Sequence, residues 1–501
     1  MAKKIHKTKK TPLFKNVGFY FVLLYALLTL GMIVQVFTVN VIPMKYAMIV
    51  CVILLLLLLG MYYLQLGRKV NKVNKVLGKI LIVILAVFLG IGNWYLFKTG
   101  SAFSRMTGDD SQTSVVSVVV MKESKAESIE DLKNSKFGLT KTGDQDIMAK
   151  GLADIKKDAG QDITTVDYKS YKTIADDLYD GKIDAIIMDE ATRSLFEDNH
   201  SKFDSETRIV KSYKYKTSTK DISKNVDVTS EPFNIYITGI DTYGTISTVS
   251  RSDVNMIATV NPKTHQVLLT SIPRDYYVPQ PCQGGQTDKL THTGIFGVDC
   301  TVETVENYFG IDINYYVRVN FSSVENIVDA LGGINVDSPI AFDALGYSFS
   351  AGTNSLNGKE ALAFSRERYS LGGGDRDRGK NQMRVITGII NKAISPSIIT
   401  NYTSILDAVS GSFQTNMSNS EMTSLIKMQI NDMSGWDIEQ IAVNGTGNAS
   451  AWSPANGFNS WVMEPNVNTV KRAVEVMKKV ENGEDVKTLA QQVMEENTAD
   501  E

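Results

Sequence analysis

Residues 364–384, FSRERYSLGGGDRDRGKNQMR, contain five arginines, one lysine, three acidic residues and three consecutive glycines. Arginine presents a planar set of N–H donors that matches a phosphate group, and it stays charged at any relevant pH. Several guanidinium groups in one segment therefore predict a site for a multiply charged anion such as phosphate or pyrophosphate. The alternative is a solvent-exposed surface on which the arginines pair with Glu367, Asp375 and Asp377.

Two local patterns would bring these cations together. Arg366 and Arg368 alternate in FSRERY, so on a strand they would point to the same face. The glycine loop is predicted to lead into a helix, whose N-terminus adds backbone N–H donors for an anion. On that helix Asp375, Arg378 and Gln382 are three and four residues apart and share one face.

Charged residues also stand at the ends of apolar segments elsewhere in the chain. The segments FNIYITGID, NMIATVNP, QVLLTSIPRD and YYVRVNF read as strands, and the charges at such ends are Asp241, Arg251, Asp253, Arg274 and Asp275. In open α/β sheets, ligands bind beyond the carboxyl ends of the strands. Carboxylates next to a phosphate suggest a bridging Mg²⁺, which favours one or two protein oxygens plus substrate phosphates. The set therefore predicts phosphoryl chemistry.

Three apolar runs, 17–42, 46–66 and 80–97, each approach the length of about 20 residues that spans a bilayer. Six lysines precede the first run and five basic residues lie between the second and third, whereas only Lys45 lies between the first and second. Because loops rich in lysine and arginine face the cytoplasm, we expect a cytoplasmic N-terminus and an extracellular remainder. Trp94 and Tyr95 would anchor the last span at the membrane interface.

The net charge of −3 conceals an uneven distribution. Residues 1–97 hold 12 of the 52 basic residues and none of the 55 acidic ones, so 40 basic residues face 55 acidic ones in the remainder. An acidic outer part argues against a nucleic-acid partner, which would require a basic surface. The basic tail, residues 1–16, is more simply explained by anionic lipid than by DNA.

The outer part is predicted to hold two α/β domains. A polar linker, 98–112, leads to a small accessory domain, 113–225, where SIEDLKNSKFGLT and LYDGKIDAIIMDE resemble one lobe of a solute-binding protein; a ligand site and a structural spacer both remain open. A larger domain, 231–480, has a mainly β central sheet flanked by helices, and 481–501 is expected to be a helical tail that frays into disorder. Cys282 and Cys300 are both expected outside the membrane, and the sequence leaves open whether they form a disulfide.

Eight segments, in order across residues 232–395, resemble the LytR-CpsA-Psr family. They are GID, RSDVNMIATVNP, TSIPRDYYV, DKLTHTGIFG, YYVRVNF, VDALGGINVDS, LNGKEALAFSRERY and GDRDRGKNQ. Three spans and an added outer domain further resemble the CpsA-like branch associated with capsule loci. The resemblance implies an Mg²⁺-assisted, membrane-anchored enzyme that moves a glycopolymer phosphate from a polyprenyl pyrophosphate carrier onto peptidoglycan. Other capsule-assembly membrane proteins are possible partners.

The resemblance also assigns roles to individual residues. Asp241 and Asp253 would hold the metal, either of them being a candidate base, and Asp375 would orient an arginine. The pyrophosphate would be surrounded by Arg251, Arg274, Lys289, Arg366, Arg368, Arg378 and Gln382. Asn381 departs from the family pattern, in which many members have a further arginine. The family's lipid tail lies in an apolar tunnel, which strand 315–321 and helix 323–331 would line if they are not plain core.

Two other functions remain open from the sequence. A non-catalytic regulator of capsule synthesis would bind the lipid pyrophosphate outside the cell and signal through its spans. A prenyl pyrophosphatase would hydrolyse the same lipid without any acceptor. No catalytic triad or zinc-binding spacing is evident, and His292 is expected to be structural.

Overall fold

The computed structural model describes residues 14, 16–107, 111–240, 246–395, 405 and 410–499. The chain divides into two units, and each is considered by itself. One unit contains residues 1–104 and 419–433, and the other contains 105–418 and 434–501.

The first unit contains three long apolar helices, as the sequence predicts. They are α1 (Val17–Val39), α2 (Met44–Leu66) and α3 (Lys72–Thr107), with mean hydropathies of 2.3, 2.7 and 2.4 in their most apolar stretches. Each is long and apolar enough to cross a bilayer, and leucine, isoleucine and valine side chains remain exposed along all three. The chain therefore has a membrane anchor. Residues 98–107 continue α3 as helix, where the sequence suggested an irregular linker.

A short helix from late in the chain also groups with the anchor. This is α13 (Asn419–Asp432), which the sequence placed in the larger outer domain. Lys427 on α13 donates a hydrogen bond of 2.6 Å to the side-chain oxygen of Asn40, the residue that ends α1. A polar contact thus joins this helix to the connection between α1 and α2.

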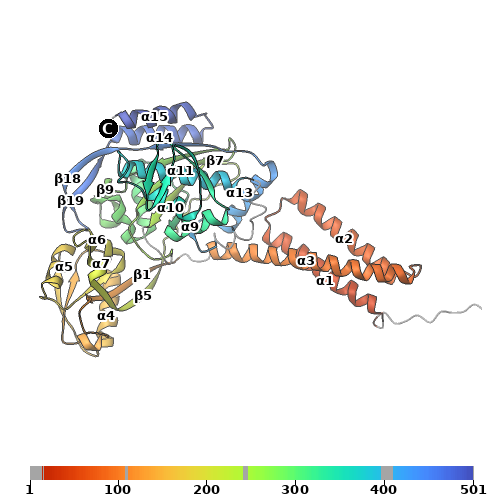
Figure 1. Ribbon diagram of the computed structural model, residues 1–501, viewed down its shortest axis with the longest axis horizontal. Helices are drawn as coiled ribbons and strands as arrows, with labels where there is room; N and C mark the ends of the chain where they lie inside the picture. The colour runs from red at the N-terminus through yellow and green to blue at the C-terminus, as the bar shows by residue number, and fades with distance from the viewer. Residues whose placement is uncertain are drawn as a thin grey trace, which may run out of the picture. The chain divides into compact units, whose positions relative to one another are not determined.

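The accessory domain is a five-stranded mixed sheet with order β3-β2-β4-β1-β5. Strands β2, β3 and β4 are parallel, and β1 is antiparallel to both β4 and β5. Because successive side chains of β1 alternate between faces, Val118 packs with the α4 cluster and Val119 with the α5 cluster. Both helices are labelled in Figure 1. The elements are β1 (Ser111–Met121), β2 (Lys136–Thr140), α4 (Gln145–Ala159), β3 (Thr164–Tyr168), α5 (Tyr171–Tyr179), β4 (Ala185–Asp189), α6 (Arg193–Glu197), α7 (Phe203–Glu206) and β5 (Thr207–Ser218).

The larger domain is built on a six-stranded mixed sheet with order β16-β11-β6-β7-β8-β17. β11 is parallel to β6 and β17 is parallel to β8, whereas the other neighbours are antiparallel. The strands are β6 (Phe233–Ile240), β7 (Val254–Asn261), β8 (Gln266–Ser271), β11 (Tyr315–Asn320), β16 (Phe413–Thr415) and β17 (Asp437–Ala442). The α/β class predicted for this domain is confirmed.

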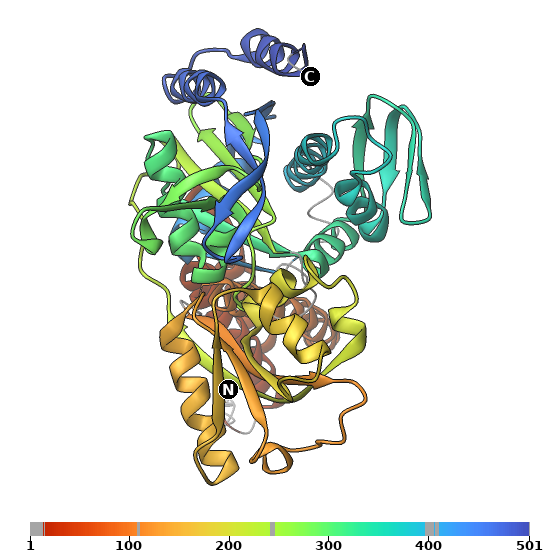
Figure 2. The ribbon, with the colours of Figure 1, turned by 90° about the vertical axis from the view of Figure 1, so that its left-hand side faces the viewer.

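Each face of this sheet meets a different set of elements. Tyr236 and Tyr316 point to the face covered by α8 (Val298–Phe309), α14 (Val467–Glu481) and α15 (Lys487–Ala499). The next residues in register, Ile237 and Val317, point the other way. Residues 321–393 form a second group of helices and hairpins around a separate apolar cluster, visible in teal in Figure 2. Its elements are α9 (Phe321–Ala330), β12 (Ile334–Ser338), β13 (Phe342–Ala344), β14 (Tyr347–Phe349), β15 (Gly352–Leu356), α10 (Gly358–Arg366) and α11 (Asp375–Ala393).

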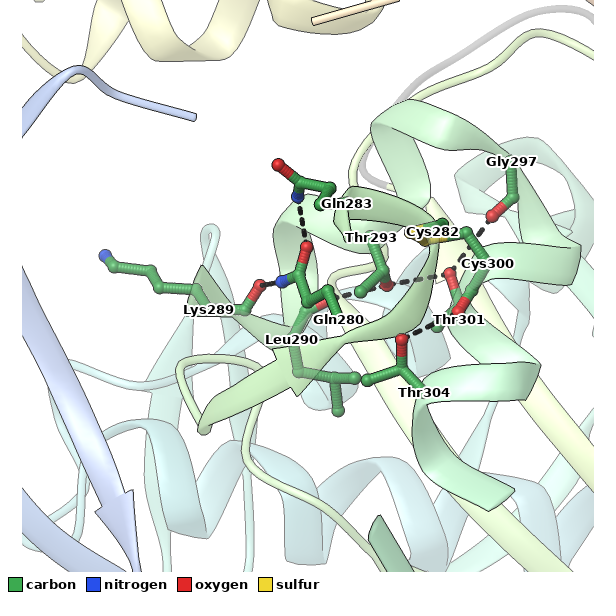
Figure 3. The surroundings of a disulfide bond; sticks show 10 residues. All are labelled: Gln280, Cys282, Gln283, Lys289, Leu290, Thr293, Gly297, Cys300, Thr301 and Thr304. Atoms are coloured by element: carbon green, nitrogen blue, oxygen red, sulfur yellow. Dashed lines mark hydrogen bonds between the residues drawn. A yellow bond between two sulfur atoms is a disulfide. The ribbon is translucent and has the colours of Figure 1, made fainter. Parts of the chain in front are cut away.

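A disulfide joins Cys282 to Cys300 and settles the pairing that the sequence left open. Cys282 lies in the turn η4 (Pro281–Gln283) between β9 (Tyr277–Gln280) and β10 (Gln286–Lys289), and Cys300 lies on α8 (Figure 3). Their Cα atoms are 5.5 Å apart, within the usual range for a disulfide. The bond attaches the hairpin that ends at Lys289 to the helix layer. A second hairpin, β18 (Gly445–Ser453) with β19 (Phe458–Pro465), lies beside it.

The C-terminal segment differs from the expected fraying tail. Val486, Ala490 and Val493 are buried in the same apolar cluster as α8 and α14, and α15 packs against β17. Their spacing of three and four residues places them on one helix face. One face of α15 is therefore part of the domain's core.

We expect Val493→Ala to lower the free energy of unfolding by about 2 kcal/mol, because it leaves a cavity in that core. Gln492→Ala, on the exposed side of the same helix, is the matched control and should leave stability unchanged. Urea unfolding followed by tryptophan fluorescence measures both variants. Equal stabilities of the two variants would show that α15 does not belong to the core.

We expect Cys282→Ser with Cys300→Ser to lower the free energy of unfolding by about 3 kcal/mol, because the bond closes a loop across a separation of 18 residues. Reductant should destabilise the wild type to a similar extent and have no effect on the double variant. A wild type that is indifferent to reductant would contradict the disulfide.

Candidate active site

Two of the predicted site residues, Asp253 and Arg274, lie at one edge of the larger sheet. Asp253 immediately precedes β7, and its backbone N–H donates to the carbonyl of Gly239 at 2.8 Å. Arg274 follows β8. The backbone of Thr291 joins both segments, since its N–H donates to Arg274 O at 2.8 Å and its carbonyl accepts from Ser252 N at 3.0 Å. Main-chain bonds thus fix Asp253 and Arg274 side by side.

An ion-pair network converges on Arg274. Its Nη1 donates to Asp253 Oδ1 at 2.6 Å, and its Nε lies 3.6 Å from Asp275 Oδ2 and 3.8 Å from Asp375 Oδ1. Arg378 Nη2 lies 2.5 Å from the same Asp375 oxygen. Lys289 joins the network through Asp275 Oδ1 at 3.3 Å. Arg274 Nε is buried, and within the described part of the chain no acceptor lies within hydrogen-bond distance of it.

Asp253 is 8% exposed yet stays ionised. Burial would raise the pKa of this carboxyl group, but the charges of Arg251, Arg274 and Arg378 outweigh it and lower the pKa to about 2. The hydroxyl group of Thr291 also donates to Asp253 Oδ1, at 3.1 Å. The site therefore holds a permanent negative charge among several cations.

Two neighbouring cavities share Asp253, Arg378 and Gln382. The first is a slot of about 30 Å³ beside Arg274 and Asp375. The second has about 290 Å³ and lies between the sheet and helices α9, α10 and α11. Its remaining lining divides into a polar set, Ser365, Arg366, Arg368 and Tyr369, and a mainly apolar set, Ile237, Gly239, Ile240, Val254, Val319, Asn320, Phe321, Val324, Leu362, Val385, Ile386 and Ile389.

The predicted face of α11 is confirmed, because Asp375, Arg378 and Gln382 line the same slot. The strand expected at FSRERY is wrong. A capping box between Asn357 and Glu360 starts helix α10, and this helix continues to Arg366. The first part of FSRERY is therefore helical. Arg366 and Arg368 nevertheless line the same cavity.

Three predicted residues need separate mention. Arg251 lines neither cavity, and its Nη1 lies 3.0 Å from Asp198 of the accessory domain. Lys289 reaches the network only through Asp275. Asp241 lies outside the described residues, although Ile240 before it lines the larger cavity.

Sequence reasoning named segment 315–321 as a possible tunnel lining, but it missed Thr291 and the contact of Phe321 with Arg366. Phe321 begins α9, and the guanidinium of Arg366 lies over its ring at 4.1 Å from the centroid, a cation–π contact. The helix is capped by Asn320 in a capping box with Ser323. Thr291 was not singled out in the sequence, where it directly precedes His292. His292 itself is buried and lies 3.0 Å from Asp288, in line with the structural role expected for it.

The arrangement suits one amphiphilic ligand. Arg366, Arg368 and Arg378 supply three positive charges around the polar end of the larger cavity, opposed there by Asp253. The rest of that cavity offers mainly aliphatic and aromatic surface. An anionic head with a hydrocarbon tail satisfies both parts, because buried charge needs a counter-charge and apolar surface gains by excluding water.

We expect Arg274→Ala to lower the free energy of unfolding by about 3 kcal/mol at pH 7, because it leaves the buried Asp253 charge without its hydrogen-bonded partner. In the wild type the depressed pKa of Asp253 stabilises the fold above the unfolded pKa of about 3.9, and this contribution is lost as the pH falls through about 2. The deficit of the variant should therefore shrink between pH 7 and pH 3. Urea unfolding at both pH values measures it, with the surface variant Arg472→Ala as control. A deficit independent of pH would contradict the role given to Asp253.

Comparison with known proteins shows which family the chain resembles. A sequence model of the LytR_cpsA_psr family matches residues 196–477, more than half of the chain. A second model, described as DNA polymerase processivity factor, matches residues 71–188, less than half.

Among curated proteins, the chain is 40% identical over 238 residues to the polyisoprenyl-teichoic acid–peptidoglycan teichoic acid transferase TagU of Enterococcus faecalis, covering 46% of this chain and 77% of the relative. It is also 40% identical over 205 residues to TagU of Bacillus subtilis, covering 41% of this chain and 65% of that protein.

Solved structures give matches over a similar part of the chain. The crystal structure of B. subtilis TagU is 34% identical with a TM-score of 0.39 and covers 50% of this chain and 96% of that one. TagT bound to LIIa-WTA is 28% identical with a TM-score of 0.41, covering 52% and 94%. On the family match and the identity to TagU, the chain belongs to the LytR_cpsA_psr family.

Proposed function

We propose that the protein transfers a glycopolymer phosphate from a polyprenyl-pyrophosphate-linked donor onto peptidoglycan. The observation that supports this most is the larger cavity, in which arginines gather at one end of a mainly apolar lining. A pyrophosphate head and a prenyl tail match those two parts. The names of the related transferases agree with a polyprenyl-linked donor and a peptidoglycan acceptor.

The donor and acceptor lie outside the cell in this proposal. Lysines precede α1, and a segment rich in lysine and arginine joins the apolar parts of α2 and α3. Because such segments face the cytoplasm, this distribution favours a cytoplasmic N-terminus. Three spans then place residues after α3 outside. Tethering to the membrane keeps the transferase near a lipid-borne donor.

In the reaction, an acceptor hydroxyl oxygen attacks the phosphorus atom that carries the glycopolymer. The bond from that phosphorus to the bridging oxygen breaks, and the prenyl phosphate leaves. The transition state of phosphoryl transfer is loose, so catalysis depends on alignment and on neutralising charge. Arg274, Arg366, Arg368 and Arg378 supply that neutralisation at the head group.

The hydroxyl proton must go to a base. With a pKa of about 2, Asp253 is a weak proton acceptor at neutral pH, because an efficient base has a pKa nearer the working pH. We assign to Asp253 the holding of cations, and to Asp241 the acceptance of the proton. In the sequence Asp241 directly follows β6, and Asp253 directly precedes β7, the strand that pairs with β6.

Mg²⁺ fits the donor set at Asp253. An ionised carboxylate is a hard ligand, and Mg²⁺ commonly takes one or two carboxylates and completes its shell with substrate phosphate and water. No group of three histidine, cysteine or acidic residues able to hold a metal occurs in the part of the chain that the structure describes. Asp253 would hold the ion, which would offset phosphate charge.

The donor polymer is proposed to be capsular polysaccharide. The three spans and the added outer domain support this choice, since they resemble the capsule-associated branch of the family. Contacts with other capsule-assembly membrane proteins through the anchor follow from the same proposal.

We expect Arg274→Ala and Arg366→Ala each to lower polymer transfer by about 100-fold, because each removes charge stabilisation from the transition state. The measurement is the amount of capsular polymer, and separately of teichoic acid, covalently attached to purified cell wall. Arg472→Ala, in a surface ion pair on α14, is the control. Capsule transcripts should stay unchanged in all three strains.

The alternatives predict other results. Altered transcripts with normal polymer attachment would favour the regulator, and would contradict transfer. Phosphate release from a prenyl pyrophosphate by the purified full chain, at equal rates with and without peptidoglycan, would favour the pyrophosphatase.

A further inference from the structure

The accessory domain holds the segment of the larger domain that carries Arg251 and Asp253. Thr113 on β1 donates its backbone N–H to Ser247 O at 2.8 Å, and its carbonyl accepts from Val249 N at 3.0 Å. The pairing adds a short piece of the larger domain to the accessory strand β1 as a parallel bridge. The backbone just before Arg251 is therefore fixed by the accessory domain.

The same segment is held from within the larger domain. Arg318 is buried on β11, and its Nη2 donates to Thr248 O at 2.7 Å. Gly294 packs against the segment so closely that a Cβ atom would lie 2.5 Å from both Ser250 O and Ser252 N. Residues 247–252 are thus clamped between two domains.

Apolar contacts reinforce this clamp. Val249 and Ile295 of the larger domain lie in one buried cluster with Leu195, Phe196 and Phe203 of the accessory domain. Leu195 and Phe196 are on α6, directly before Asp198. Burial of these side chains fixes the end of α6 next to the clamped segment.

At this interface Asp198 holds the guanidinium of Arg251. Asp198 Oδ2 lies 3.0 Å from Arg251 Nη1, with the arginine side chain 14% exposed and the aspartate 47% exposed. Arg251 Nε is buried and has no hydrogen-bond partner among the residues that the structure describes. Arg251 lines neither cavity, whereas Asp253, two residues further on, lines both.

We infer that Asp198 is a positioning residue of the transferase site, by which the accessory domain holds the side chain of Arg251 at the domain interface and keeps it from Asp253. The inference rests on the proposed function. Arginine has a long side chain with many rotamers, and an ion pair at one end restricts them. Released from Asp198, Arg251 would turn to the nearby carboxylate of Asp253 and compete there with Arg274.

A general charge effect predicts the opposite result. Removal of Asp198 makes the protein more positive, which by long-range attraction alone would strengthen the binding of an anion. Asp204, 2.7 Å from Arg193 on the same accessory helix pair, offers a matched control with the same change of charge. The sign of the effect therefore separates positioning from overall electrostatics.

The test measures binding of geranylgeranyl pyrophosphate to the full chain in detergent micelles. We expect Asp198→Ala to raise Kd about fivefold, the size of an exposed ion pair, and Asp198→Asn to raise it less because a hydrogen-bond acceptor remains. Asp204→Ala should leave Kd at the wild-type value or lower it. The melting temperature of each variant is measured to exclude unfolding.

A double-mutant cycle with Arg251→Ala gives the second readout. If Asp198 acts through Arg251, Asp198→Ala should have no further effect once Arg251 is absent. Additive effects, or an Asp198→Ala variant that binds like Asp204→Ala, would overturn the inference while leaving the proposed function intact. A wild type that does not bind the prenyl pyrophosphate would overturn the proposed function, and this inference with it.

Discussion

The contact between Asp253 and Arg274 is the interaction on which the rest of the site depends. Both ions are largely withdrawn from water, and a buried ion is costly unless a partner and hydrogen bonds compensate it. The compensation comes from main-chain bonds through Thr291, which hold two strand ends together, and from Asp375 on α11. The ion pair between Arg274 and Asp375 therefore links the sheet to α11, the helix that carries Arg378. Without these carboxylates, the positive charges of the arginines would repel one another and would not be held close together.

That convergence gives the larger cavity two chemical ends. The sheet side and helices α9, α10 and α11 offer an apolar wall, while the ends of α10 and α11 bring guanidiniums to its edge. Such a cavity discriminates by requiring both halves of a ligand. A free phosphate gains nothing from the apolar wall, and a neutral lipid leaves the cations without a counter-charge. The accessory domain enters this scheme through Arg251, whose direction is set from outside the larger domain.

Local patterns were predicted well from the sequence, and long-range contacts were not. The three spans follow from the length of the apolar runs, and the shared face of Asp375, Arg378 and Gln382 follows from helical spacing; the structure keeps both. The strand at FSRERY failed because alternation over six residues is weaker than the helix already started at the capping box before it. The tail was misjudged because its polar composition hides the spacing of its buried residues. The pairing of Arg251 with Asp198 joins residues 53 apart in different domains, and no local pattern encodes it.

The central claim is that distant guanidiniums converge on one lipid-linked pyrophosphate. The most direct test is an experimental structure of the full chain in lipid nanodiscs with geranylgeranyl pyrophosphate bound. The account predicts the pyrophosphate within hydrogen-bond distance of Arg366, Arg368 and Arg378, with the prenyl chain against Val319, Val385 and Ile389. A pyrophosphate bound elsewhere, or these three arginines directed to separate surfaces, would contradict it.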